Sequence, residues 1–332
     1  MKKIVKIIAL ILIAAMLFAF AACNTGKKTI VVIKFGTHTS LDEINDAIVS
    51  TLKEKGYGNG QYKILERNAE FSADTASQII AAVKNKADVV VAIATPVAQV
   101  AFNALSDDTP IVFSAVSDPV GAGLVQNLNA PEANITGTSD EIQITMLIDV
   151  AIETGNVQGN KTLNNLGFIY NPAEANSVSN LAKIQAYCTE KGITLKTRTI
   201  SAAGEMSEIA KALVPTVDAM LVTDDNTVAS AMTVLADECR EVVIPCYTGA
   251  DSEVKDGGML CIGINYTRLG KDTADMVAQI LDGKAIKDIP VKVYNKAGDL
   301  NVYVNDDYIT QTGITLPASV TGNQNLVHYQ DN

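Results

Sequence analysis

The chain of 332 residues has no tryptophan and only two histidines, His38 and His328. A sugar site built on stacked tryptophan rings is therefore excluded, and zinc or Ser-His-Asp chemistry would lack most of its histidines. There is no Walker A motif and no Gly-x-Ser-x-Gly elbow, and Gly121-x-Gly123 lacks the third glycine of a dinucleotide fingerprint. We therefore expect neither an enzyme nor a bound cofactor or metal ion.

Basic residues are in the minority, with 26 Lys and Arg against 37 Asp and Glu and a formal net charge of −11. Proteins that bind nucleic acid need a basic surface to meet the phosphate backbone. The composition therefore argues against a nucleic-acid partner.

Long apolar runs are also scarce, and the N-terminal run at residues 7–22 is too short for the roughly 20 residues of a membrane span. Lys2, Lys3 and Lys6 precede this run, and Ala21-Ala22-Cys23 ends it. The order of basic, apolar and small residues is typical of a secretory signal.

The cysteine at the end of this signal is typical of a bacterial lipoprotein. We interpret residues 1–22 as the signal peptide, Cys23 as the lipidated first residue of the mature chain, and residues 23–28 as a tether. Phe20 stands where such signals usually have leucine. An ordinary signal cleaved nearby, or a buried N-terminal anchor helix, remains an alternative.

Short apolar runs alternate with amphipathic segments through the rest of the chain, as in parallel sheets covered by helices. The pattern occurs twice, and the mature chain exceeds the roughly 250–300 residues above which chains usually split into domains. The sequence therefore predicts an α/β fold of two Rossmann-like lobes with parallel sheets, joined by a multi-strand hinge.

The lobes are expected to exchange segments, with crossings near Thr138, Asn265 and Pro290. The predicted boundaries are 29–138 plus about 265–290 for the N-terminal lobe, 139–264 plus about 291–318 for the C-terminal lobe, and 319–332 for a loose polar tail. Ser40-Leu-Asp-Glu43 matches a capping box and predicts a helix start. Cys188, Cys239, Cys246 and Cys261 match no metal motif, and buried thiols are favoured over a disulfide.

Ligands of open parallel sheets bind beyond the carboxyl ends of the strands. The loops at these places are dense in Ser, Thr, Asn and Asp and contain no Lys or Arg. Several carboxylates would repel a phosphate or sulfate, whereas a zwitterion could offer its ammonium to Asp118, Asp140 or Asp225 and its carboxylate to donors at helix starts. Each of these residues alone is more typical of an ordinary helix cap, but together the loops favour a ligand cleft.

Several of these segments resemble the ABC-transporter substrate-binding protein family that includes the tryptophan-binding lipoprotein type. The similarity covers roughly residues 29 to 318, and residues 110–124 are its most specific part. The other matching segments are residues 94–99, 134–140 and 170–177, and Gly257-Gly258 before the strand that ends at Ile264.

The resemblance implies a type I periplasmic-binding fold, an extracytoplasmic location, and delivery of a small solute to an ABC permease and its ATPase. An amino acid is the favoured solute, and some members of the family look specific for aromatic ones. We expect a monomer that contacts the membrane only through its lipid anchor. A ligand sensor for a membrane receptor remains an alternative, and an exported hydrolase a weaker one.

The candidate ligand-binding residues lie in the loops after the strands. The resemblance places foremost Ser117, Asp118, Ser139, Asp140, Asn176, Ser177, Asp225 and Asn226, and the loop positions add Thr39, Ser40, Thr95, Pro96 and Thr248.

Overall fold

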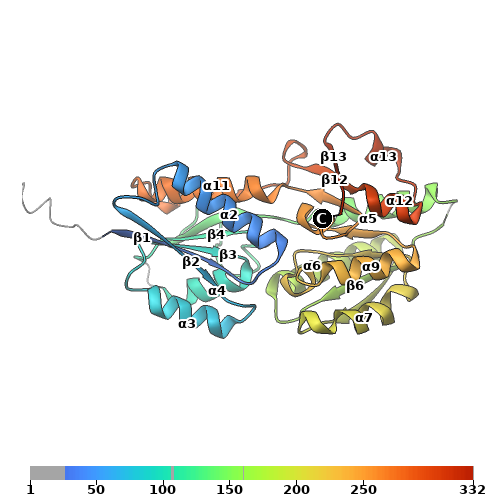
Figure 1. The fold of residues 1–332 in the computed structure, drawn as a ribbon, viewed down its shortest axis with the longest axis horizontal. Coiled ribbons are helices and arrows are strands. Elements are labelled where there is room, and N and C mark those ends of the chain that lie inside the picture. Colours follow the sequence, from blue (N-terminus) through green and yellow to red (C-terminus); the bar gives the residue numbers. More distant parts are fainter. Residues whose placement is uncertain (1–26, 106–107, 160, 332) are drawn as a thin grey trace, which may run out of the picture.

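The computed structural model describes residues 27–105, 108–159 and 161–331. The expected signal peptide and Cys23 lie outside the described residues. The described chain forms two lobes side by side, each a sheet covered by helices (Figure 1). Each lobe has its own hydrophobic core, so the predicted two-lobed α/β fold is confirmed. None of the helices in the described residues could span a membrane.

A six-stranded parallel sheet forms the first lobe, in the order β11-β5-β4-β3-β1-β2. Its strands are β1 (Lys28–Lys34), β2 (Tyr62–Asn68), β3 (Val89–Ile93), β4 (Ile111–Ser114), β5 (Ile135–Ser139) and β11 (Lys292–Val293). Helices α2 (Thr39–Glu54) and α11 (Tyr266–Leu281) cover one face, and α3 (Ala73–Val83) and α4 (Thr95–Ala104) cover the other (Figure 1). Strand β3 is buried along its whole length, as expected for an apolar strand covered on both faces.

A seven-stranded sheet forms the second lobe, in the order β13-β12-β10-β9-β8-β6-β7. Its strands are β6 (Asn165–Tyr170), β7 (Thr194–Thr199), β8 (Ala219–Leu221), β9 (Cys246–Thr248), β10 (Leu260–Gly263), β12 (Asn301–Asn305) and β13 (Leu326–Tyr329). Strands β10 and β12 pair antiparallel, and the other described pairs are parallel.

Eight α-helices belong to the described part of the second lobe, and short 3₁₀ helices occur in both lobes. The α-helices are α5 (Ile144–Val157), α6 (Ala175–Lys191), α7 (Met206–Leu213), α8 (Asn226–Ala229), α9 (Met232–Val242), α10 (Asp251–Lys255), α12 (Asp306–Thr312) and α13 (Ala318–Thr321). The 3₁₀ helices are η1 (Ala203–Glu205), η2 (Val214–Thr216), η3 (Ile286–Asp288) and η4 (Ala297–Asp299).

The described chain passes between the lobes after β5, after β10, and between β11 and β12. The last passage comes a few residues later than the expected boundary at about residue 290. Lys292 and Val293 still pair with Thr138 and Ser139 in the first sheet, and Tyr294 is fully buried in the core of the first lobe. Three adjacent crossings of this kind provide the multi-strand hinge of the fold.

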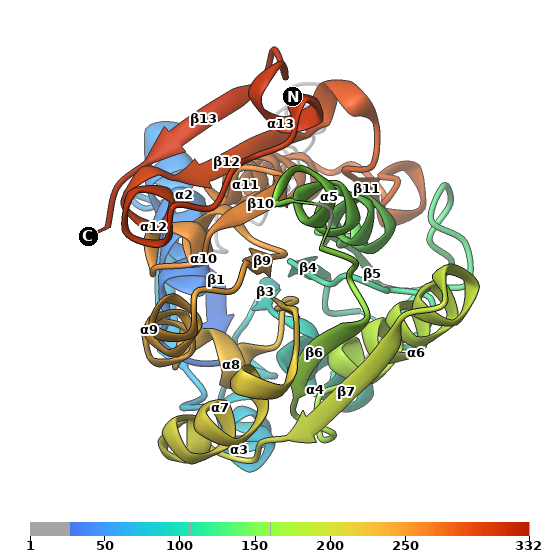
Figure 2. The same cartoon turned by 90° about the vertical axis from the view of Figure 1, so that its right-hand side faces the viewer.

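The segment beyond residue 318, which the sequence predicts to be a loose tail, instead forms α13 and β13. Strand β13 pairs with β12 at one edge of the second lobe (Figure 2). Tyr329 stacks on Tyr303 with ring centroids 5.4 Å apart, and Arg240 holds Asp331 at 2.6 Å. The polar residues around β13 mask its short apolar pattern in the sequence.

The predicted capping box at Ser40 and Glu43 does not form. Helix α2 begins at Thr39, with His38 at the N-cap position and no side-chain cap. Ser40 and Glu43 instead contact Ser252 and Lys255 of the second lobe. A pattern that normally closes a helix end serves here to join the lobes. Cys188, Cys239, Cys246 and Cys261 are free and buried, in line with the favoured interpretation.

Candidate functional site

A small cavity lies between the two lobes, where strands of both sheets end. The first sheet contributes residues that follow β1, β3, β4 and β5, and the second contributes residues that follow β6, β8 and β9. This is the position at which open parallel sheets bind ligands. The cavity volume is about 20 Å³, which accommodates about one water molecule. A ligand as large as an amino acid therefore enters only when the lobes move apart.

Five of the predicted residues line this cavity, and all five are buried. They are Ser40, Thr95, Asp140, Asn176 and Asn226. They come from α2, α4, the segment after β5, α6 and α8, so folding brings five distant segments together. Their roles toward a ligand remain predictions.

Three predicted residues lie outside the cavity lining and join the lobes. Thr39 donates a hydrogen bond to Asp256 at 2.9 Å, and Ser117 donates to Asp224. Asp118 accepts hydrogen bonds from the Ser179 hydroxyl at 2.7 Å and from the Gly121 amide at 2.8 Å. These contacts belong to the closed arrangement of the lobes.

The remaining five predicted residues support loops and helix starts outside the cavity lining. Pro96 lies in the first turn of α4, Ser139 donates to the Ser117 carbonyl at 3.2 Å, and Thr248 donates to the Ala250 carbonyl at 3.1 Å. Asp225 caps α8 through the Val228 amide at 3.0 Å, and its other oxygen accepts from Ser177 at 2.7 Å.

Asp140 has one carboxylate oxygen with a partner and one without. One oxygen, Oδ2, accepts a hydrogen bond from the Tyr266 hydroxyl at 2.8 Å. The other, Oδ1, is buried without a hydrogen-bond partner. Burial, followed by repulsion from Asp224, raises the pKa of Asp140 to about 7. The side chain is thus prepared to accept a cationic or hydrogen-donating group.

The neighbouring acidic side chains are instead occupied by protein donors. Asp224 accepts from Ser117, from Asn180 at 2.6 Å and from Asn176 at 3.2 Å. Glu174 accepts from the amide N–H groups and side chains of Asn226 and Thr227, at distances from 2.6 to 3.1 Å. Burial, followed by the charge of Asp225, raises the pKa of Glu174 to about 8. These carboxylates hold the loops of the second lobe in place.

Four other cavity-lining side chains have a buried polar atom without a partner. They are His38 through Nδ1, Thr95 through Oγ1, Asn176 through Oδ1 and Glu253 through Oε1. Burial lowers the pKa of His38 to about 4, so its ring is neutral at physiological pH. Because buried polar groups in native proteins are normally satisfied, this concentration of unpaired atoms at one cavity indicates a ligand site.

The first lobe brings strained backbone to the cavity wall. Ala94 and Ala115 line the cavity and have φ angles of 80° and 55°, a region that residues other than glycine rarely adopt. They follow β3 and β4, and Ala94 immediately precedes α4. Strain of this kind concentrates at binding sites. Here it turns the start of α4, with its positive dipole end, toward the cavity.

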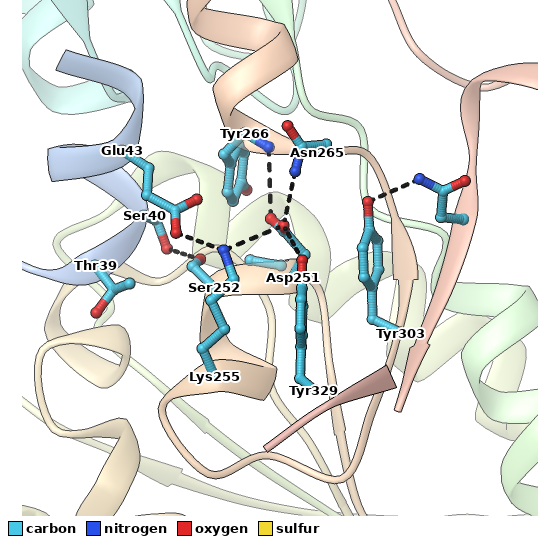
Figure 3. Close-up of polar contacts among 12 residues, drawn as sticks. Thr39, Ser40, Glu43, Asp251, Ser252, Lys255, Asn265, Tyr266, Tyr303 and Tyr329 are labelled. Carbon is cyan, nitrogen blue, oxygen red and sulfur yellow. Dashed lines mark hydrogen bonds and ion pairs between the residues drawn. The ribbon is translucent and has the colours of Figure 1, made fainter. Parts of the chain in front are cut away.

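Helices α2 and α10 join the lobes through side-chain contacts, as Figure 3 shows. Ser40 lies 2.6 Å from Ser252 between their hydroxyl oxygens, and Lys255 pairs with Glu43 at 2.6 Å. Together with the hydrogen bond from Thr39 to Asp256, these pairs form what we call the α2–α10 contact. The aromatic ring of Tyr329 from β13 lies beneath Lys255 at 5.0 Å, so the C-terminal strand supports this contact.

Four chemically important lining residues were not among the predicted ones: His38, Asp224, Glu253 and Tyr266. His38 and Asp224 lie in loops that the sequence analysis identifies as candidate binding positions, and neighbouring residues in these loops were predicted in their place. Glu253 and Tyr266 lie just inside helices that follow β9 and β10. Nothing in their local pattern distinguishes them from ordinary helix residues, and their role comes from the packing of the two lobes.

A larger cavity of about 190 Å³ lies within the second lobe, away from the cleft. Its wall includes Leu163, Val243 and Ile314 at the opposite end of the sheet. In the described residues, none of its lining side chains has a buried unpartnered polar atom. Chemistry therefore favours the smaller cavity as the site, although the other has more space.

Most of the chain is similar to known solute-binding proteins. A family model for the ABC transporter substrate binding protein matches residues 29–326. A tyrosine-binding protein of Clostridioides difficile (strain R20291) is 32% identical over 295 residues, which cover 86% of this chain and 83% of the relative.

Two similar solved structures represent a ligand-bound form and a ligand-free, open form. The crystal structure of an ABC domain in complex with L-Trp from Streptococcus pneumonia is 30% identical, with a TM-score of 0.81 over 91% of this chain and 100% of that one. The ligand-free, open structure of a substrate binding protein from Clostridium difficile is 32% identical, but its TM-score is 0.65 over 92% of this chain and 100% of that one. At similar identity, this chain therefore superposes better on the ligand-bound structure than on the ligand-free, open one. The chain belongs to the ABC transporter substrate-binding protein family and has its type I periplasmic-binding fold.

Proposed function

We propose that the protein is the solute-binding component of an ABC importer and closes its lobes around an amino acid. One observation carries this proposal. Asp140 Oδ1 is buried without a partner, and the described residues that line the cavity include no Lys or Arg. A buried carboxylate without a counter-charge is unfavourable. The ammonium group of a ligand would supply that charge.

The two ends of the amino acid would contact different elements. The ammonium group would donate to Asp140 Oδ1 and to Asn176 Oδ1, both of which are unpaired acceptors. The carboxylate would accept from the Thr95 hydroxyl and from amide N–H groups in the first turn of α4. This arrangement places a negative group at the positive end of a helix.

An aromatic side chain is the favoured third part of the ligand. Leu41, Ile44, Ala250 and Tyr266 give the cavity an apolar wall, and burial of apolar ligand surface against it would add affinity. Relatives at 30–32% identity are named for tyrosine or were solved with L-Trp. Phosphate and sugar ligands fit this combination of acids and apolar groups less well.

A thermal-shift screen of the twenty amino acids, followed by calorimetry, tests the proposal. A ligand at about 100 times its dissociation constant should stabilise the fold by about 2.7 kcal/mol. Small-angle scattering should show compaction when this ligand is added, because closure around the solute is the usual response of two-lobed binding proteins. Binding of an uncharged sugar, with no response to any amino acid, would overturn the proposal.

The site of action follows from the family and from the N-terminal sequence. Substrate-binding proteins of ABC importers work outside the cytoplasmic membrane. We propose that Cys23 carries lipid, tethers the protein there and lets it deliver the solute to a membrane permease. The Cys23→Ala variant should lose the membrane fraction or remain unprocessed. Normal processing and tethering of this variant would contradict the lipid anchor.

A further inference from the structure

Glu253 is a buried carboxyl group that faces the cavity with one oxygen free. It is 1% exposed and lies in the first turn of α10. Its Oε2 atom accepts a hydrogen bond from the Ala250 amide at 3.2 Å, which is the backward half of a capping box. Its Oε1 atom has no partner. The cap fixes the side chain, so the free oxygen has a defined direction.

The unpaired atoms of the cavity outnumber the hydrogens of one ammonium group. His38 Nδ1, Asp140 Oδ1 and Asn176 Oδ1 are unpaired acceptors, and Glu253 Oε1 is a fourth unpaired oxygen, on a carboxyl whose pKa is raised by burial. The His38 Nε2 atom lies 3.3 Å from Asn226 Oδ1, while the amide nitrogen of Asn226 donates to Glu174. Nε2 therefore carries the ring hydrogen and Nδ1 is an acceptor. An ammonium group has three hydrogens, so one polar atom is left for another part of the ligand.

The position of Glu253 places it near the apolar part of the cavity. Helix α10 contacts α2 through Ser252 and Ser40, at 2.6 Å between hydroxyl oxygens. Helix α2 supplies the apolar lining residues Leu41 and Ile44. Asp140, Asn176 and Thr95, which we assign to the charged ends of the amino acid, belong to other elements. Glu253 Oε2 is bonded to the amide of Ala250, which belongs to the apolar wall of the cavity, so the free oxygen lies beside part of the wall where the ligand's side chain is expected.

We propose that Glu253 is a specificity-determining residue that hydrogen-bonds a polar group on the side chain of the amino acid. This inference rests on the proposed function. A phenol or indole group would satisfy Oε1, whereas the benzyl group of phenylalanine would leave it buried and unpaired. A site built to bond a ligand's O–H or N–H group rejects analogues that lack it. The cavity therefore favours tyrosine or tryptophan over phenylalanine.

Calorimetry with L-tyrosine, L-tryptophan and L-phenylalanine on the mature protein tests this inference. The wild type should bind tyrosine or tryptophan at least about tenfold more tightly than phenylalanine, since one net hydrogen bond of about 1.4 kcal/mol is a factor of ten. Equal affinity for all three would overturn the assignment. Failure of all three to bind would instead count against the proposed function.

Two variants show whether Glu253 is the group responsible. Glu253→Leu should weaken binding of the polar-tipped amino acids and bring their affinities within about threefold of that of phenylalanine. Glu253→Gln keeps hydrogen-bonding atoms of similar shape and should retain part of the preference. An equal loss for all three ligands in Glu253→Leu would overturn the inference and assign Glu253 to the ammonium group. If Glu253→Leu does not fold, the wild-type preference and Glu253→Gln still decide.

Discussion

The two sides of the inter-lobe cavity differ in chemistry. The first lobe offers the Thr95 hydroxyl, the neutral His38 ring, the start of α4 and the apolar residues of α2. The carboxyl groups in the lining, Asp140, Asp224 and Glu253, come from the second lobe or from the crossing that leads to it. A zwitterion would thus have its ends held mainly by different lobes. A ligand that contacts both sides favours the closed form, because only closure brings both sets of partners to it.

The largest expected effect comes from removing Asp140, the carboxyl group that we assign to the ammonium. Asp140→Ala should weaken binding of the native amino acid by about tenfold to a hundredfold, since charge-assisted hydrogen bonds contribute roughly 1.5–3 kcal/mol. Calorimetry would measure this change, and circular dichroism would confirm an intact fold. Asp149→Ala is the control, because that carboxylate contacts Tyr187 and Lys191 within the second lobe and lies outside the cavity lining. Similar losses in both variants would contradict the assignment.

A second prediction contrasts Asp140 with Asp225, whose oxygens are occupied by protein donors. Asp225 caps α8 and accepts from the Asn171 amide at 2.6 Å. Asp225→Ala should therefore lower the free energy of unfolding of the ligand-free protein by roughly 2 kcal/mol. Asp140→Ala should cost less or even stabilise, because it removes a buried carboxyl with an unpaired oxygen. Urea unfolding measures both. A reversed order would mean that the two acids exchange their structural and binding roles.

The contrast between these two acids also shows what the sequence can predict. The alternation of apolar and amphipathic segments predicts both sheets, because the pattern of a buried parallel strand such as β3 is local. The loops after the strands were located for the same reason. Which of the two carboxylates keeps an unpaired oxygen depends on donors that are distant in the chain. Tyr266 donates to Asp140, and Asn171 donates to Asp225. No local pattern reports these contacts.

The same limit explains why the sequence does not predict the contacts of Ser40 and Glu43 or the formation of strand β13. Ser40 and Glu43 match a helix cap, but partners on α10 outcompete the cap, and those partners lie more than 200 residues away. Strand β13 is recognisable only beside β12 and Tyr303. Sequence patterns identify elements and loop positions, whereas contacts between lobes require the folded chain.

A third prediction uses pH to sharpen the assignment of Asp140. Burial and the nearby Asp224 raise its pKa to about 7, so the ammonium of the ligand must displace a proton below that pH. Affinity should fall by about tenfold between roughly pH 7.5 and roughly pH 5.5. His38, with a pKa lowered to about 4, stays neutral in this window. Calorimetry at several pH values should show this slope in the wild type and a flatter one in Asp140→Asn. Equal slopes would assign the titration to another group.

The stability of the ligand-free protein should respond to pH with the opposite sign. The pKa of Asp140 rises from 3.8 to about 7 on folding, and that of Glu174 from 4.5 to about 8. Folding is therefore favoured by protonation of these groups. The stability that these two groups contribute to the folded protein is fully present below about pH 4 and is lost as the pH rises through about 7 to 8. Between roughly pH 5.5 and roughly pH 7.5, a rise in pH should therefore increase the affinity for the amino acid and lower the free energy of unfolding of the ligand-free protein.

The smallest effect is expected for the ion pair of the α2–α10 contact, which joins the lobes. Neither Lys255 nor Glu43 lines the cavity. Lys255 and Glu43 are paired at 2.6 Å, with each side chain 21% exposed. Solvent weakens such pairs to about 0.2–1 kcal/mol, so Lys255→Met should raise the dissociation constant only about two- to fivefold. Because the pair joins the closed lobes, the change should appear mainly as faster ligand release in stopped-flow measurements.

An ion pair at the end of the same helix provides the control for this last prediction. Lys55, the residue directly after α2, pairs with Asp275 on α11 at 2.8 Å, and both helices belong to the first lobe. Lys55→Met removes a surface ion pair of the same kind but leaves the contact between lobes intact, so ligand release should be unchanged. A double-mutant cycle of Lys255→Met with Glu43→Gln would isolate the coupling between the lobes. Equal effects of Lys255→Met and Lys55→Met would show that the α2–α10 pair stabilises its surroundings without controlling closure.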